Sequence, residues 1–423
     1  MEQSVTKFWN KNFIMLVIGQ IVSLFGNAIL RFALPMYVLL TYGSPELMGR
    51  VMALAVVPMI VIAPFGGVIA DRLNKKRLIV FLDFFTAAGV FIYLWAIGSL
   101  SIVPITIIAL MMLIAINGMM GPATDSSFPL IVPAEQLVRA NSITMAINTL
   151  AMMVGPPLGG ILLAEFGLNS LLIVGGISFA LAATMEVFIR IPSIKHKSSG
   201  SMIRVIVGDL GAGIRFAVKE QTIIAKILLV VIMFSLIVAS FGLIALPVLV
   251  TQYLNMTSRM AGLAAGILGA GGVAGSILAG ILGQKMNIRM NHWPLLIIGI
   301  CLAPMGLAFF LSTNAIVAFV TLVAVMFCLM GASTVFTVQM LTFIQRITPP
   351  ELLGKTMALI MTATVLSQPL GQWAYGILFE RLMETPWIII FSVSFLAVII
   401  ALWARGYFRS IPAEPMAVVE SRP

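Results

Sequence analysis

Twelve long apolar segments recur along the 423-residue chain and constrain its fold more than any other feature. A membrane-spanning helix needs about 20 predominantly apolar residues. Only 9% of the residues are charged, against about 25% in soluble domains, which excludes a soluble enzyme, a nucleic-acid binder and a disordered scaffold. We therefore predict an all-α membrane protein with twelve transmembrane helices, at residues 12–40, 46–70, 77–98, 102–127, 140–165, 169–190, 222–250, 259–283, 293–312, 314–345, 352–379 and 385–408.

The basic residues are distributed unevenly between the loops. With the N-terminus placed in the cytoplasm, 21 of the 25 Lys and Arg residues lie on the cytoplasmic side, three on the opposite side, and Arg31 inside a span. The positive-inside rule then predicts that both termini are cytoplasmic. The formal charge of +10 is accounted for by this topology and by lipid headgroups, not by nucleic acid.

The longest polar interruption, residues 191–221, separates two sets of six spans. The two sets also resemble each other: GGVIADRLNKKR from Gly66 aligns with AGILGQKMNIRM from Ala279, and PLGG from Pro157 aligns with PLGQ from Pro369. Parallel six-span repeats are typical of transporters, with the substrate path at the repeat interface. We predict two pseudo-symmetric bundles, 1–190 and 222–423, joined by a cytoplasmic linker at 191–221.

The loop after the second span carries a charged motif. It reads GVIADRLNKKR and resembles the hallmark loop of the major facilitator superfamily, which implies that fold and a conformational latch. An aspartate can accept hydrogen bonds from a helix N-terminus, and a basic cluster can bind helix C-termini. Asn74 stands where the family has a second glycine; asparagine also tolerates the left-handed conformation, so we expect the turn to survive. The alternative is a basic turn that only enforces topology. The latch residues are Gly67, Asp71, Arg72, Lys76 and Arg77.

The fifth span contains the sequence GPPLGG from Gly155, which resembles the glycine-proline motif of the superfamily's exporters. Proline removes a backbone donor and bends a helix, and glycine permits close helix packing. The motif predicts a kinked, tightly packed helix, and an ordinary packing kink is the alternative. The residues concerned are Gly155, Pro156, Gly159 and Gly160.

Two further stretches, IGQIVSLFGNAILRFALPMYV from Ile18 and FPLIVPAEQLVRANSI from Phe128, resemble the macrolide-efflux and enterobactin-exporter branch. This resemblance implies export of a lipophilic or amphipathic small molecule (drug, macrolide or siderophore-like) across a bacterial cytoplasmic membrane by alternating access. Proton antiport without a cofactor is the expected energy source. One departure is that no Arg or Lys lies between Arg77 and Arg139, where many proton-coupled members carry an arginine in span 4.

Polar residues inside the spans are few and fall on single helix faces. Ser23, Asn27 and Arg31 are four residues apart, so they share one face of the first span. Buried amides can orient a ligand through hydrogen bonds, and packing between helices is their alternative role. Arg31 could instead snorkel, or pair with Glu46 or Glu165. The predicted substrate-cavity residues are Asn27, Arg31, Asn117, Asn148, Gln368, Gln372 and Tyr375.

The carboxylates Asp83, Asp125 and Glu186 all lie towards the cytoplasmic ends of their spans. A charge at the centre of a span costs about 2.5–3.5 kcal/mol on insertion scales, so each needs a reason. We predict Asp125 as the proton-coupling residue, with a helix-end carboxylate as the alternative. For Asp83 the prediction is a salt bridge to the basic loop six residues earlier.

Three other functions remain open at this point. An uptake permease or a flippase for a lipid-like substrate would share the fold. A membrane enzyme would need convergent His, Cys or carboxylate groups at depth, and the two histidines lie in predicted loops. A sensor would need a sizeable soluble domain. We therefore predict no enzyme and no metal site. The glycine-rich eighth span favours intramolecular packing and a monomer whose partners are membrane lipids and the substrate.

Overall fold

The computed structural model describes residues 8–60, 62, 73–192, 211, 214–216, 221–282, 288–311 and 314–409. Every regular element in these ranges is a helix. The chain forms two compact units. The N-terminal unit comprises Met1–Met202 and Thr257–Gly266, and the C-terminal unit comprises Ile203–Met256 and Ile267–Pro423. The bundle limits 1–190 and 222–423 stay a prediction, and most of the linker lies outside the described residues.

The N-terminal unit contains one helix that the sequence divides into two spans. α7 contains a single residue with non-helical angles, Gly167, which has a φ of 71°. Two helices meet at a kink at this residue. Glycine adopts this positive φ because it has no Cβ atom. The helices of this unit are α1 (Lys11–Tyr42), α2 (Pro45–Ala55), α4 (Lys75–Ala96), α5 (Ile102–Asp125), α6 (Phe128–Ile131), η1 (Ala134–Gln136) and α7 (Leu137–Val187).

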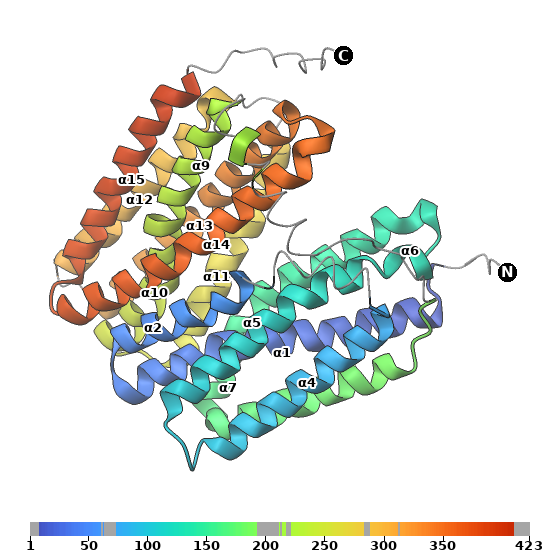
Figure 1. Cartoon of the computed structure of the whole chain (residues 1–423). Coiled ribbons are helices and arrows are strands. Elements are labelled where there is room, and N and C mark those ends of the chain that lie inside the picture. The colour runs from blue at the N-terminus through green and yellow to red at the C-terminus, as the bar shows by residue number, and fades with distance from the viewer. Residues whose placement is uncertain are drawn as a thin grey trace, which may run out of the picture. The chain divides into compact units, whose positions relative to one another are not determined.

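α7 is the helix with the most extensive packing in the N-terminal unit. α1 and α4 both pack along it, and α5 packs on α4 (Figure 1). A buried apolar cluster lies at one end of these helices, where Phe13, Phe128 and Ile131 are at most 2% exposed. In a membrane protein such side chains stabilise helix association through close van der Waals packing.

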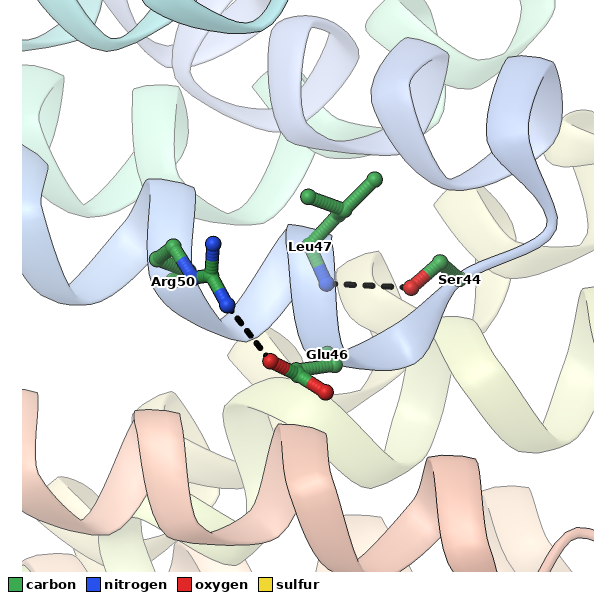
Figure 2. A network of polar contacts seen from close by, with 4 residues as sticks. All are labelled: Ser44, Glu46, Leu47 and Arg50. Atoms are coloured by element: carbon green, nitrogen blue, oxygen red, sulfur yellow. Dashed lines mark hydrogen bonds and ion pairs between the residues drawn. The ribbon is translucent and has the colours of Figure 1, made fainter.

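The start of α2 shows how local sequence fixes a helix end. Ser44 accepts a hydrogen bond from the backbone N–H of Leu47 at 3.2 Å, and Pro45 occupies the first turn (Figure 2). Serine is a favoured N-cap because its oxygen satisfies a free amide. Glu46 forms an ion pair with Arg50 at 2.6 Å, one turn along the same helix (Figure 2). Glu46 therefore pairs within α2, and not with Arg31.

The C-terminal unit contains a segment that alternates between α and π geometry. Two π turns, η3 (Ser235–Ala239) and η4 (Leu249–Tyr253), flank α10 (Ser240–Val248) and continue α9 (Thr222–Phe234). π turns inside helices often mark functional sites. α11 (Ser258–Leu282) begins in the N-terminal unit, which includes Thr257–Gly266, and ends in the C-terminal unit. The other helices of the C-terminal unit, drawn from light orange to red in Figure 1, are η5 (Ile288–Met290), α12 (His292–Phe310), α13 (Ala315–Ile347), α14 (Pro350–Arg381) and α15 (Pro386–Arg409).

Nine helical segments of the described chain are long and apolar enough to cross a membrane. α7 is one of them and contains two of the twelve spans expected from the sequence. The expected span 46–70 is described only in part, by α2 and the few residues after it. α14, which carries the predicted cavity residues Gln368, Gln372 and Tyr375, is 32 residues long but is not among the nine.

Candidate functional site

Two asparagines predicted to line the substrate cavity meet inside the N-terminal unit. The side-chain amide of Asn117 on α5 donates to Oδ1 of Asn27 on α1 at 3.4 Å. Asn27 in turn donates to the backbone carbonyl of Leu113 at 3.3 Å. Asn27 is buried, and Asn117 is half-buried. Asn27 therefore holds α1 and α5 together. Asn117 can still offer its side-chain amide to a ligand.

Arg31 and Asn148 behave differently from this pair. Arg31 lies one turn beyond Asn27 on α1 and is exposed, and within the described residues it forms no hydrogen bond or ion pair. Such a guanidinium is free to bind an anionic or carbonyl-bearing ligand. Asn148 is exposed and donates to the carbonyl of Thr144 in its own helix at 3.1 Å. Their roles in binding remain predictions.

In the C-terminal unit, polar residues of α14 lie beside the first π turn, η3. Tyr375 is buried and donates its hydroxyl hydrogen to the carbonyl of Ile237 at 2.8 Å. The carbonyl of Gln368 accepts from Ser240 at 3.1 Å. Gln372 is 2% exposed, and its Oε1 has no hydrogen-bond donor among the described residues. Tyr375 therefore holds helices together, while Gln372 keeps an unused acceptor.

The described part of the latch loop begins at Leu73, so Gly67, Asp71 and Arg72 lie outside it. Asn74 has φ −66°, and its side chain accepts from the N–H of Arg77 at 3.1 Å. Asn74 therefore does not use the left-handed conformation that asparagine tolerates: the residue caps α4, because its side chain satisfies a first-turn amide. Lys76 and Arg77 stand in that first turn, half-buried and exposed respectively.

Lys75 was not among the predicted latch residues, yet it makes the motif's described link to another helix. Its ammonium group donates to the carbonyl of Ser126 at 2.6 Å. Ser126 directly follows α5, where the helix dipole leaves partial negative charge. A cation at a helix C-terminus is the interaction that the motif predicts, so the spacing of the basic cluster could have identified it.

The GPPLGG motif brings backbones together within the N-terminal unit. α7 keeps helical angles through Pro156 and Pro157. A Cβ atom on Gly159 would lie 2.9 Å from the carbonyl oxygen of Ile29 on α1. The carbonyl of Gly160 accepts a hydrogen bond from Ser258 at 3.2 Å, at the start of α11. Close packing at these glycines is thus observed, while the proposed kink stays a prediction.

The three carboxylates differ in their surroundings. Asp125 is the last residue of α5 and is exposed. Asp83 and Glu186 are 1% and 2% exposed. Asp83 accepts a hydrogen bond from Ser23 at 2.8 Å, and its neighbour is Glu186. Among the described residues, Asp83 forms no salt bridge with the basic loop, contrary to the expectation. The sequence signal that points to these two residues is the high free-energy cost of placing a carboxylate inside a span.

No group of three or more His, Cys, Asp or Glu side chains in the described ranges could hold a metal ion. Cys301 and Cys328 are free thiols. The candidate substrate residues carry amides, one hydroxyl group and one guanidinium group, which can bind a ligand through hydrogen bonds and charge.

Known proteins are similar to this chain along nearly its whole length. The chain is 24% identical over 390 residues to Macrolide efflux protein A of Streptococcus pyogenes. The matched region covers 90% of this chain and 93% of that protein. It is 21% identical over 424 residues to the uncharacterized MFS-type transporter YkuC of Bacillus subtilis, with coverages of 98% and 95%. Both relatives extend over nearly the whole chain.

Solved structures show the same fold at low identity. The nucleoside transporter NupG gives a TM-score of 0.71 at 12% identity, over 95% of this chain and 99% of that one. The D-xylose-proton symporter gives 0.70 at 14% identity, over 96% and 99%. The Major Facilitator Superfamily model matches residues 16–371 and 228–418. These matches confirm the predicted fold class: the chain belongs to the major facilitator superfamily, and it is a multi-pass membrane protein and a secondary transporter, not an enzyme.

Proposed function

We propose that the protein exports a lipophilic or amphipathic small molecule from a bacterial cytoplasm by alternating access, coupled to proton entry. The observation that carries this proposal is the similarity to Macrolide efflux protein A over 90% of the chain. The candidate substrate residues are compatible with it, because amides beside apolar side chains can orient a weakly polar molecule through a few hydrogen bonds. The excess of Lys and Arg on one side supports cytoplasmic termini.

Efflux measurements test this proposal directly. Expression in a pump-deficient bacterial host should lower the accumulation of one or more members of a panel of macrolides and lipophilic dyes. A protonophore should restore accumulation, because it removes the driving force. The vector alone is the control. Unchanged accumulation across the whole panel, with the protein present in the membrane, contradicts the proposal.

An uptake permease or a flippase for a lipid-like substrate is the competing function of the same fold. Right-side-out vesicles separate the two directions. An exporter leaves such vesicles depleted of substrate, whereas an importer accumulates it inside them. If the substrate accumulates inside these vesicles and the accumulation depends on the proton gradient, the protein is an importer and the export proposal is wrong.

The latch proposal is tested by Asp71→Asn. This change removes the negative charge that can bind a helix N-terminus, so we expect a several-fold fall in efflux. Thermal unfolding of the purified protein should stay close to that of the wild type, because the substitution preserves shape. Glu46→Gln, which alters a surface ion pair at the start of α2, is the matched control and should retain efflux. Full efflux by Asp71→Asn would remove the latch role.

A further inference from the structure

Two carboxyl groups from different helices meet in the interior of the N-terminal unit. Asp83 of α4 and Glu186 of α7 are neighbours there. Their side chains are 1% and 2% exposed. Two carboxylates without a proton can only accept hydrogen bonds, so a hydrogen bond between them requires one proton.

α1 closes this pair from the third side. Ser23 donates its one hydroxyl hydrogen to Oδ1 of Asp83 at 2.8 Å. Gly19, one turn earlier, faces Glu186, and a Cβ atom there would lie 2.8 Å from Oε1. Glycine at this position therefore leaves the space that the carboxyl group occupies. A larger residue would push Glu186 away from Asp83.

The donors around the pair are too few for two ionised groups. Oδ2 of Asp83 and Oε2 of Glu186 are buried and have no hydrogen-bond donor in the part of the chain that the structure describes. A buried acceptor without a donor costs about 1–3 kcal/mol, and more when it is charged. One proton held between the carboxyl groups would supply the missing hydrogen bond.

No described cation neutralises the pair. The ion pair found among the described residues is that of Glu46 with Arg50, on α2. Within the part of the chain that the structure describes, Asp83 and Glu186 act on each other, and Ser23 is the other side chain that bonds to Asp83. The other charged groups of the four packed helices are Lys11 and Arg31 on α1, Lys75, Lys76 and Arg77 on α4, Asp125 on α5, and Arg139 and Glu165 on α7.

We propose that Asp83, Glu186 and Ser23 form a proton-binding site of the transport cycle, a role that rests on the proton-coupled export proposed above. On uptake, an O–H bond forms on one carboxylate as an O–H bond of a hydronium ion breaks, which leaves a carboxylic acid and water. On release, the O–H bond of the acid breaks and the proton passes to water, which leaves the carboxylate and a hydronium ion.

The geometry links this site to the candidate substrate residues. Ser23 and Asn27 lie one turn apart on the same face of α1. Ser23 bonds to Asp83, and Asn27 bonds to the α5 residues Leu113 and Asn117. A shift of α1 that accompanies ligand binding at Asn27 moves the hydroxyl group of Ser23 relative to Asp83. The proton affinity of the pair then depends on the position of α1.

Infrared spectroscopy of the purified protein tests proton binding without knowledge of the substrate. The wild type at neutral pH should show the absorption of a protonated carboxyl group that is protected from solvent. The double variant Asp83→Asn, Glu186→Gln should lose this absorption. Glu165→Gln removes an exposed carboxyl group from α7 and should leave it unchanged. The same absorption in the double variant and the wild type would overturn the site.

Transport assays in reconstituted vesicles test coupling separately. Glu186→Gln should lose the acceleration of efflux by a proton gradient and retain exchange of substrate at equal pH. Asp83→Asn should behave in the same way, which guards against a folding defect in either variant. If the wild type exports no panel member, the proposed function fails while the infrared result still decides the proton site. If the wild type exports and both variants keep full gradient dependence, the coupling role is overturned.

Discussion

Gly160→Ala is expected to lower the thermal stability of the protein and to reduce transport several-fold. Within the N-terminal unit, Gly160 of α7 faces Ser258 and Gly262 of α11. An added Cβ atom would collide with the carbonyl oxygen of Ser258 and lie 3.1 Å from Cα of Gly262. These are backbone atoms, which cannot move aside as a flexible side chain can. Overpacking of this kind costs about 1–3 kcal/mol.

The reciprocal change tests the same contact from α11. In Gly262→Ala the Cβ atom would lie 2.5 Å from the carbonyl oxygen of Pro156, so a similar loss is expected. Gly175→Ala is the matched control on α7, because its Cβ atom would lie 3.5 Å from a methyl group of Leu30, an ordinary contact. Unfolding midpoints in detergent and efflux rates are the measurements. Wild-type values for both Gly160→Ala and Gly262→Ala would show that the helices are not in close contact here.

The sequence predicted the fold because the bilayer imposes one requirement on every span. Each spanning segment must be long, apolar and helical, since backbone groups find no water in the membrane. The length of the apolar segments therefore identified helices such as α1, α5 and α12, and the motif after the second span identified the family. Gly167 was the one residue needed to divide α7 into the two predicted spans.

The candidate site was only partly predictable, because spacing fixes a helix face but not its neighbour. The four-residue spacing correctly placed Ser23 and Asn27 on one face of α1. Whether that face meets α4 or α5 depends on how α1 is rotated in the unit, and its strongly apolar sequence gives little information about rotation. Asp83 was accordingly assigned to the nearby basic loop, although its described partners come from α1 and α7.

Local hydrogen bonding accounts for another part of the difference. Asn148 satisfies its amide on the carbonyl of Thr144, four residues earlier in the same helix. Polar side chains in apolar helices commonly bond to the preceding turn in this way. A polar residue on a predicted cavity face is therefore not necessarily available to a ligand. Asn27 and Asn117 differ because each reaches a neighbouring helix.

Gly371→Ala is expected to destabilise the C-terminal unit at least as much as Gly160→Ala destabilises the N-terminal one. PLGQ from Pro369 aligns with PLGG from Pro157, so Gly371 is the counterpart of Gly159. Gly159 faces the carbonyl of Ile29, in span 1, and Gly371 faces the carbonyl of Leu236, in span 7. The two repeats thus use the same glycine for the equivalent helix crossing, which explains why the motif survives in both.

The π turn makes the second crossing less tolerant than the first. A Cβ atom on Gly371 would collide with the carbonyl oxygen of Leu236 and lie 2.6 Å from Cβ of Ser240. Ser240 is already fixed, since its hydroxyl group bonds to the carbonyls of Ser235 at 2.9 Å and Gln368 at 3.1 Å. The cost should reach the upper part of the range of about 1–3 kcal/mol for overpacking.

A second substitution separates the two sources of this cost. Ser240→Gly, added to Gly371→Ala, removes the clash with Ser240 and leaves that with Leu236, so we expect partial recovery of the unfolding midpoint. Gly354→Ala is the control on α14, because no atom lies within 4 Å of its added Cβ. It should match the wild type or exceed it slightly, since alanine favours the helix. Full recovery by Ser240→Gly would assign the cost to the side chain alone, and a neutral Gly371→Ala would show that α14 does not press against the π turn.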